Sequence, residues 1–478
     1  MLKNRTIAIG AALIGAVSIG VLMFEWNGRL STFGLRHAES ADTPKVSLRR
    51  LSPGILSLAL QTGGASAGGL ALQKDGTIVV GATTWMPPPD KSLGVVLRLT
   101  SNGRLTHPAA TVLADTETIV SGVSTAPDGT IMVVGYGASG GLSATRHFRV
   151  ARLLSNGVLD PTFGRHGMTL ANMRSSIIWW LGDAARGLAL QGDGRIVVTG
   201  SAIYPLGPLS QAAYCATARL NQDGRLDGSF ADKGRVLTLL PGKTSCSGGA
   251  VFVAPDGGLI VAGNASTEGV PSRRSIAILR YLPSGAPDPI FGRDGVAELE
   301  MDAHAQGAAL DSQGRIVIVG TAASTRLLVT RFDGHGDVDQ SFGASGTVSL
   351  HDVGVPQMLR AVALQPDGKI VAVGTLGWHS SGRVPEPGKR DQIVVVRLDP
   401  NGVLDKSFAG GGLLLMASPR YLWSGHGIAI QPDGKLLIVG DIVEEAENGT
   451  LSRSAIVLVR LRPDGTPDAD FGSSVDTP

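Results

Sequence analysis

The chain has 478 residues, of which 66 are glycine, 17% are charged and only 5% are aromatic. Glycine at about twice its usual share, without a strict every-third spacing, excludes collagen, and a hydrophobic content of 43% excludes a charge-driven disordered chain. With 42 basic and 40 acidic residues the net charge is +2, which gives no indication of nucleic-acid binding.

The first 30 residues have the pattern of an export signal. Two basic residues precede an uncharged apolar run of 18 residues, Ile7–Phe24, which reaches the lower limit for a membrane-spanning helix. The nearest small-x-small cleavage site, Ala38–Ser40, lies well beyond this run, which favours a retained anchor over a cleaved peptide. Either form predicts an N-terminal hydrophobic helix at residues 1–30, a polar linker at 31–46, and an extracytoplasmic remainder in the periplasm, on the cell surface or secreted.

From residue 47 onward a unit of about sixty residues recurs seven times. Each copy has a turn, in most copies Asp-Gly, followed by an apolar run, and then an arginine with a glycine five residues later. In six of the seven copies a phenylalanine follows six residues after that glycine. The glycines of the first turn are Gly76, Gly129, Gly194, Gly257, Gly314, Gly368 and Gly434, and the phenylalanines are Phe163, Phe230, Phe291, Phe342, Phe408 and Phe471.

Each copy predicts four short strands. In the third copy they fall at residues 188–191, 195–198, 216–220 and 235–239. Short runs rich in Val, Ile and Leu, separated by Asp-Gly, are typical of β-hairpins, because glycine supplies the positive φ of a tight turn. Seven such units predict an all-β fold, a seven-bladed β-propeller of four-stranded antiparallel blades over residues 47–478.

The two chain ends predict how the ring closes. The seventh copy stops at Phe471-Gly472 without a fourth strand, whereas residues 48–60 form an orphan half-copy with the arginine-to-glycine spacing kept from Arg49 to Gly54. Joining the N- and C-terminal strands in one blade buries an otherwise open edge. The alternative, an open solenoid, requires terminal repeats that look like caps.

The pattern of Asp-Gly, Arg-Leu and Leu-Asp-x-x-Phe-Gly resembles the bacterial delta-60 repeat, and the resemblance covers nearly all of residues 47–472. Copy one departs from it, since Leu105-Thr106-His107-Pro108 replaces the Leu-Asp-x-x-Phe segment. The resemblance implies an exported or surface protein and supplies no catalytic residues.

The repeated charges predict structural pairs. In six copies an aspartate follows the repeated arginine by eight residues, so that the two side chains face each other across the third turn. Such cross-strand pairs contribute roughly 0.2–1 kcal/mol each. The pairs are Arg152–Asp160, Arg219–Asp227, Arg280–Asp288, Arg331–Asp339, Arg397–Asp405 and Arg460–Asp468. The phenylalanine of each copy is expected in the core between blades.

The only two cysteines, Cys215 and Cys246, leave their state open. They pair in an oxidising compartment or stay as two buried thiols. Two cysteines cannot complete a four-ligand zinc site, and no histidines have metal-ligand spacing, so neither a metal nor a cofactor is expected.

The loops predict an interaction face. The first and third turns of a four-stranded meander lie on one face, and the second turns and the crossings between blades lie on the other, where every length change falls. All five tryptophans beyond the signal region fall in these variable segments. The candidate binding residues are Trp85, Trp179, Trp180, Tyr204, Trp378, Arg383, Arg420, Tyr421 and Trp423. The alternative is that these rings pack the loops onto the blades.

The sequence therefore predicts an exported binding or scaffold protein of the cell envelope, which engages a protein or a glycan through its variable face. No nucleic-acid partner is expected, and the membrane is contacted only through the N-terminal segment. The alternative is an exported propeller hydrolase or lyase with a site at the channel mouth, which converging histidines and carboxylates would favour. Two Gly-x-Ser-x-Gly segments, at 64–68 and 137–141, lack the strand-to-helix turn of a nucleophile elbow, so no catalytic residue is predicted.

Overall fold

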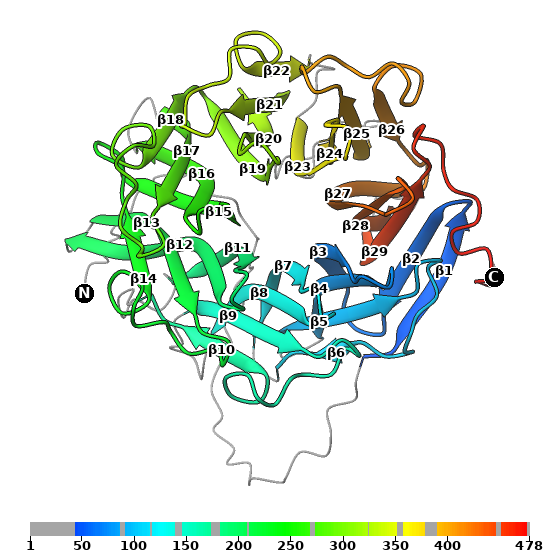
Figure 1. Cartoon of the computed structure of the whole chain (residues 1–478). Coiled ribbons are helices and arrows are strands. Elements are labelled where there is room, and N and C mark those ends of the chain that lie inside the picture. Colours follow the sequence, from blue (N-terminus) through cyan, green and yellow to red (C-terminus); the bar gives the residue numbers. More distant parts are fainter. Residues whose placement is uncertain are drawn as a thin grey trace, which may run out of the picture.

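The strands of the protein form a ring of β-sheets around a central axis (Figure 1). The computed structural model describes residues 44–86, 91–114, 117–138, 146–173, 182–207, 210–267, 273–323, 325–350, 357–377, 390–445 and 451–475. Within these ranges the regular elements are all strands, and no helix suited to crossing a membrane is present. The predicted N-terminal helix and most of the linker lie outside the described residues.

Four of the sheets have four strands each. They contain β3 (Ala65–Leu72), β4 (Ile78–Met86), β5 (Lys91–Leu99) and β6 (Thr111–Val112); β7 (Ile119–Thr125), β8 (Ile131–Ala138), β9 (Arg146–Leu153) and β10 (Met168–Ala171); β19 (Ala303–Leu310), β20 (Ile316–Ala322), β21 (Arg326–Phe332) and β22 (Thr347–Leu350); and β23 (Gln357–Leu364), β24 (Ile370–Leu376), β25 (Gln392–Leu398) and β26 (Leu413–Met416). In each sheet the strands are consecutive and antiparallel, as hairpin turns require.

A fifth sheet joins the two ends of the described chain. It contains β1 (Val46–Ser52), β2 (Ile55–Leu60), β29 (Leu451–Leu461), β28 (Leu436–Glu445) and β27 (Tyr421–Ile430) in that order. The pairing of β2 with β29 is the union of N- and C-terminal strands that the half-copy predicts. The additional outer strand β1 makes this sheet five-stranded.

The prediction of seven separate four-stranded blades is wrong. Five of the six sheets are single blades of four or five strands, whereas the sixth is one eight-stranded sheet. That sheet contains β11 (Ala184–Leu190), β12 (Ile196–Gly207), β13 (Ser210–Leu220), β14 (Arg235–Thr238), β15 (Ser245–Val253), β16 (Leu259–Thr267), β17 (Arg273–Tyr281) and β18 (Val296–Glu300). Its two meanders merge because β13 and β15 lie side by side at one parallel pair, Ala213 with Ser245. A disulfide between Cys215 and Cys246 holds the same two strands together.

The hydrophobic core lies between neighbouring four-stranded units, and the repeated phenylalanines fill it as predicted. All six rings are buried. Each ring packs against the glycine that stands five residues after the repeated arginine of the following copy. A side chain would not fit at this glycine: a Cβ on Gly465 would lie 2.8 Å from the Phe408 ring. Gly465 also has a φ of +90°, which disfavours any other residue.

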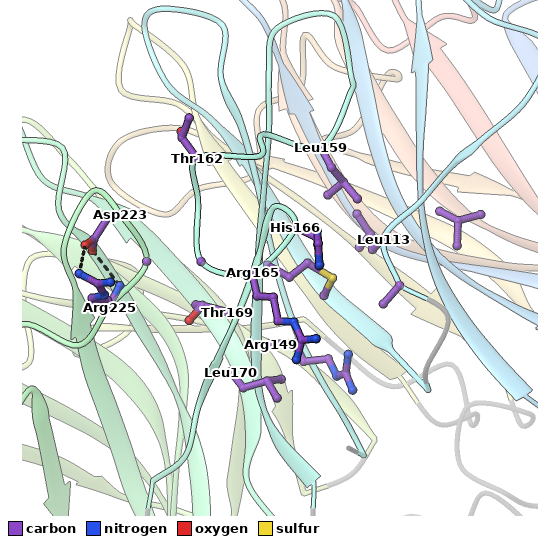
Figure 2. A pocket seen from close by; sticks show the side chains of 15 residues that line it. Leu113, Arg149, Leu159, Thr162, Arg165, His166, Thr169, Leu170, Asp223 and Arg225 are labelled. Atoms are coloured by element: carbon purple, nitrogen blue, oxygen red, sulfur yellow. Dashed lines mark hydrogen bonds and ion pairs between the residues drawn. The ribbon is translucent and has the colours of Figure 1, made fainter. Parts of the chain in front are cut away.

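One interface has no such phenylalanine. Of the seven core clusters among the described residues, six contain one, and the cluster between the β3–β6 and β7–β10 sheets does not. This is the interface at which copy one would supply the ring. A pocket opens beside it, between β10 and the segment that follows β6 (Figure 2).

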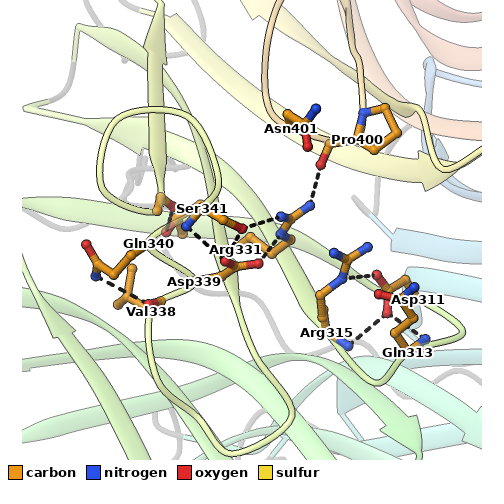
Figure 3. Close-up of polar contacts among 12 residues, drawn as sticks. Asp311, Gln313, Arg315, Arg331, Val338, Asp339, Gln340, Ser341, Pro400 and Asn401 are labelled. Atoms are coloured by element: carbon orange, nitrogen blue, oxygen red, sulfur yellow. Dashed lines mark hydrogen bonds and ion pairs between the residues drawn. The ribbon is translucent and has the colours of Figure 1, made fainter.

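The predicted arginine–aspartate pairs are confirmed in all six copies. The distances from arginine Nε to aspartate Oδ2 are between 2.7 and 2.9 Å. The prediction missed a second contact of these arginines. Most of them also donate a hydrogen bond through Nη1 to a turn carbonyl of the next copy. Arg331, for example, contacts Asp339, Ser341 and the carbonyl of Pro400 at once (Figure 3). Its guanidinium also lies 4.5 Å from the centre of the Phe342 ring.

Candidate functional site: the loop face and the innermost strands

The two ends of the strands differ in regularity. In six of the seven first turns the aspartate side chain accepts a hydrogen bond of 2.8–3.2 Å from the backbone N–H two residues later. At the other end, which we call the loop face, the hairpins vary in length. The β12–β13 ladder extends to Gly207 and Ser210, whereas the β20–β21 ladder ends at Ala322 and Arg326. A uniform scaffold therefore carries variable loops on one face.

Trp85 presents an exposed ring on the loop face. It lies near the end of β4, and 40% of its surface is exposed. Its backbone is fixed, since its N–H donates to the Gly64 carbonyl at 3.1 Å and its carbonyl accepts from the Gly63 N–H at 2.5 Å. An aromatic ring held by a rigid backbone loses little entropy when a partner covers it.

Arg420, which is exposed, and Tyr421, which is half-buried, form a second group at the start of β27. The Arg420 guanidinium lies 5.7 Å from the centre of the Tyr421 ring and forms an ion pair with Glu444 on the neighbouring strand. The Arg420 side chain is 60% exposed. The group combines a planar cation with an aromatic face, two features enriched at binding hot spots.

Two of the candidate aromatic residues are mainly packed into the fold. Trp423 is only 5% exposed and belongs to the core cluster between β24 and β28. The Tyr204 hydroxyl donates to the carbonyl of Met173, and its ring meets Tyr214 edge-on with 5.4 Å between centres. The remaining candidates, Trp179, Trp180, Trp378 and Arg383, lie outside the described residues.

The innermost strands show a feature that the sequence analysis missed. Each of the seven carries a β-bulge at the same position, which leaves one residue unpaired. Bulges redirect a side chain and are common beside functional sites. The unpaired residues are Gly68, Ser121, Arg186, Gly249, Gln306, Arg360 and His426. Two of the seven are glycines, and the other five are polar or charged. The sequence contained a signal for these positions, because the strands around them consist mainly of small or apolar residues.

His426 of the innermost strand β27 and Asp441 of the neighbouring strand β28 lie in contact. The His426 Nε2 atom lies 3.3 Å from Asp441 Oδ2 and 2.9 Å from Ser424 Oγ. Asp441 is also bound to the neighbouring sheet, because it accepts from Ser66 Oγ at 2.6 Å and from the Ala67 N–H at 2.8 Å. In a catalytic triad the carboxylate and the nucleophile contact opposite ring nitrogens, whereas here both contact Nε2. This arrangement is therefore not a Ser-His-Asp triad.

Charges of both signs surround these residues. Burial lowers the pKa of His426 against the opposing effect of Asp441, and burial with nearby Arg274 and Arg186 lowers the pKa of His304 to about 4. Both histidines are therefore neutral at pH 7. Burial also lowers the pKa of Arg360, and Asp441 opposes this effect. Arg360 remains charged because the pKa of a free arginine lies far above 7.

Within the described residues no group of three or more His, Cys, Asp or Glu is arranged to hold a metal.

Comparison with known proteins supports the repeat architecture. Residues 126–163, 191–230, 254–291 and 431–471 match a family described as a domain of unknown function (DUF5122) beta-propeller. The match supports a β-propeller repeat protein, and the finer delta-60 assignment stays a prediction. None of the curated proteins matches the chain.

Several solved structures are similar in outline. A protein of unknown function from Dyadobacter fermentans is 11% identical, with 87% of this chain and 98% of that chain covered and a TM-score of 0.41. The β-propeller domain of the trilobed protease from Pyrococcus furiosus is 12% identical, with 86% and 98% covered and a TM-score of 0.42. The polysaccharide lyase Uly1 is 9% identical, with 83% and 90% covered and a TM-score of 0.43. At these values no activity can be transferred to this chain.

Proposed function

We propose that this chain is an exported binding protein of the cell envelope that engages a protein or a glycan through its loop face. The observation that carries the proposal is the exposed Trp85 ring on a fixed backbone, at the face where the loops vary. Exposed Arg420 with half-buried Tyr421 adds a second anchor of the residue types common at interfaces. Rigid strands that present variable loops are the usual arrangement of a binding scaffold.

Export is supported by two features. The apolar run at 7–24 follows two basic residues, as in a signal peptide or a signal anchor. The Cys215–Cys246 disulfide is of the kind that persists in oxidising compartments such as the periplasm or the cell exterior. The proposal therefore places the propeller outside the cytoplasm, anchored by residues 7–24 or released from them.

The test compares two surface variants with the wild-type chain. The binding variant combines Trp85→Ala with Arg420→Ala and Tyr421→Ala. The control is Ile290→Ala, which removes a 79% exposed apolar side chain from the uniform turn face. Each chain is immobilised and exposed to defined envelope glycans and to envelope extract. A partner retained by wild type and by Ile290→Ala, and lost by the binding variant, supports the proposal. Equal retention by all three chains contradicts it.

A second candidate function is an exported hydrolase or lyase, and it is favoured by the His426–Asp441 contact. These two residues satisfy the expectation that a histidine and a carboxylate converge, although Asp441 is already held by Ser66 and Ala67. His426→Gln keeps a hydrogen-bonding side chain and removes the acid–base group. Cleavage of envelope polysaccharides by wild type and not by His426→Gln would favour the enzyme. No cleavage by wild type would remove this candidate.

A further inference from the structure

A buried arginine occupies a core position that is apolar in every other copy. Arg149 stands three residues before the repeated Arg152, and only 5% of its surface is exposed. The corresponding residues of the other copies are all buried and apolar: Val95, Ala216, Ala277, Leu328, Val394 and Val457. A full charge in such a position costs stability unless it is paired, which indicates that a function retains it.

The hydrogen bonding of Arg149 is incomplete. One guanidinium nitrogen, Nη2, donates to the Ala138 carbonyl at 2.6 Å, and the buried Nε has no partner. The carboxylate that acts most strongly on it, Glu117, lies 3.6 Å from a different arginine, Arg146. Within the described part of the chain, no carboxylate forms an ion pair with Arg149. The side chain can therefore accept an anionic partner without breaking an existing pair.

Arg149 lines a pocket of about 1020 Å³ at the interface without a phenylalanine. Copy one lacks that ring, and its fourth strand, β6, has only two residues. At the corresponding position Gly157 meets the stem of Arg98 instead of an aromatic ring. The Arg98 stem therefore takes the place of the ring, and the pocket lies beside the short fourth strand, whose Val112 lines it.

The pocket combines a basic group with an apolar wall. Figure 2 shows Arg165 and His166 near Arg149, and both are exposed. Leu159, Met168 and Leu170 also line it. On the far side, Arg225 is already paired with Asp223 at 3.5 Å. Arg149 and Arg165 have no carboxylate partner among the described residues. Together with three apolar side chains they match a molecule with a negative head and an apolar body.

We propose that this pocket binds a small organic acid, whose carboxylate contacts Arg149 and Arg165 and whose apolar body lies against Leu159, Met168 and Leu170. Arginine presents several N–H donors in a plane and suits a carboxylate in this way. The pocket lining includes neither Trp85 nor Arg420 nor Tyr421, so this proposal does not depend on the function proposed above.

Octanoate is a suitable probe because it has one carboxylate and an apolar chain. We expect calorimetry to detect its binding to the full chain, and to detect much weaker binding of octan-1-ol and of inorganic phosphate. Arg149→Met should weaken octanoate binding by about ten- to a hundred-fold, as expected for a lost charged hydrogen bond. Arg165→Ala should also weaken it.

The matched control is Arg293→Ala. Arg293 follows Phe291 as Arg165 follows Phe163, with a left-handed residue next in both turns, and it lies outside the pocket. The Arg293→Ala variant should leave octanoate binding unchanged.

The Arg149→Met variant should also fold at least as stably as wild type, because its apolar side chain matches the residues of the other copies. No octanoate binding by wild type, equal binding by Arg149→Met, or equally tight binding of octanol or phosphate would each overturn the proposal.

Discussion

At the scale of single residues, the repeated arginines connect neighbouring copies as well as neighbouring strands. Arg460 and Asp468 are 3% and 1% exposed, and Arg460 Nη1 donates to the Ser101 carbonyl at 2.5 Å, in the sheet that follows around the ring. Arg98 donates to the Asn156 carbonyl although copy one has no aspartate to pair with it. In copy one the arginine therefore makes the contact between copies without a paired aspartate.

Removing one partner of a buried pair should cost more than the cross-strand value expected from the sequence. Asp468→Asn leaves the buried Arg460 charge uncompensated, and we expect the free energy of unfolding to fall by about 3–5 kcal/mol. Urea unfolding measures this change. The control is Asp433→Asn, which changes a 53% exposed turn aspartate and should have little effect. Equal loss from both variants would show that burial of the pair does not set its contribution.

The same aspartates predict how stability depends on pH. Hydrogen bonds from Ser407 lower the pKa of Asp405 to about 2. Burial by itself would raise the pKa of Asp160, Asp227, Asp339 and Asp468, but their hydrogen bonds and arginines outweigh it and lower each pKa. Because each folded-state pKa lies below the unfolded value, these aspartates contribute to the free energy of unfolding. The contribution is fully present above a pH of about 4 and is lost as the pH falls toward 2. Urea midpoints should fall over this interval, and a midpoint that stays constant down to pH 2 would contradict the assignment.

At the scale of elements, the disulfide reinforces a sheet that, within the described part of the chain, is alone in joining two meanders. Cys215 and Cys246 are both buried, and they connect β13 to β15 next to the Ala213–Ser245 pair. With a sequence separation of 31 residues, the cross-link should contribute about 2–4 kcal/mol to stability. We expect the double variant Cys215→Ala and Cys246→Ala to unfold at a lower temperature than wild type. Dithiothreitol should not change the unfolding temperature of this variant. Wild type in dithiothreitol should shift toward the variant, and a wild-type midpoint that is insensitive to reductant would contradict this role.

The elements that the sequence predicts are those decided by short-range chemistry. Asp-Gly turns, the arginine–aspartate offset and the phenylalanine positions depend on a few residues at fixed spacing, so the hairpins and the core could be anticipated. The eight-stranded sheet depends on a single crossing between β13 and β15, which the repeat spacing does not encode. The His426–Asp441 contact depends on the bulge that leaves His426 unpaired in β27, which the repeat spacing does not show. Arg149 could have been noticed, because aligning the copies places it among apolar residues.

At the scale of the whole molecule, the ring is closed by two strands from the beginning of the propeller. Leu56 and Leu58 of β2 are fully buried and pair with Leu458 and Ile456 of β29. Leu56 also packs where Gly103 and Gly472 leave space for it. Without β2, the backbone groups of β29 would form an open edge that can pair with another chain. Closure therefore protects the molecule from self-association as well as contributing buried apolar surface.

This leads to a prediction for a chain that begins at residue 61 instead of residue 44. We expect the shorter chain to unfold at a lower temperature, since burying a leucine side chain is worth about 1.5–3 kcal/mol, and to self-associate in size-exclusion chromatography. Leu56→Ala in the longer chain is the control: it should lose about 2–5 kcal/mol of stability and stay monomeric, because its β2–β29 ladder remains. A synthetic peptide of residues 44–60 should restore the monomer by adding the missing strand. If the shorter chain were monomeric without the peptide, the open edge would not be what closure protects, and the N-terminal strands would act through apolar burial alone.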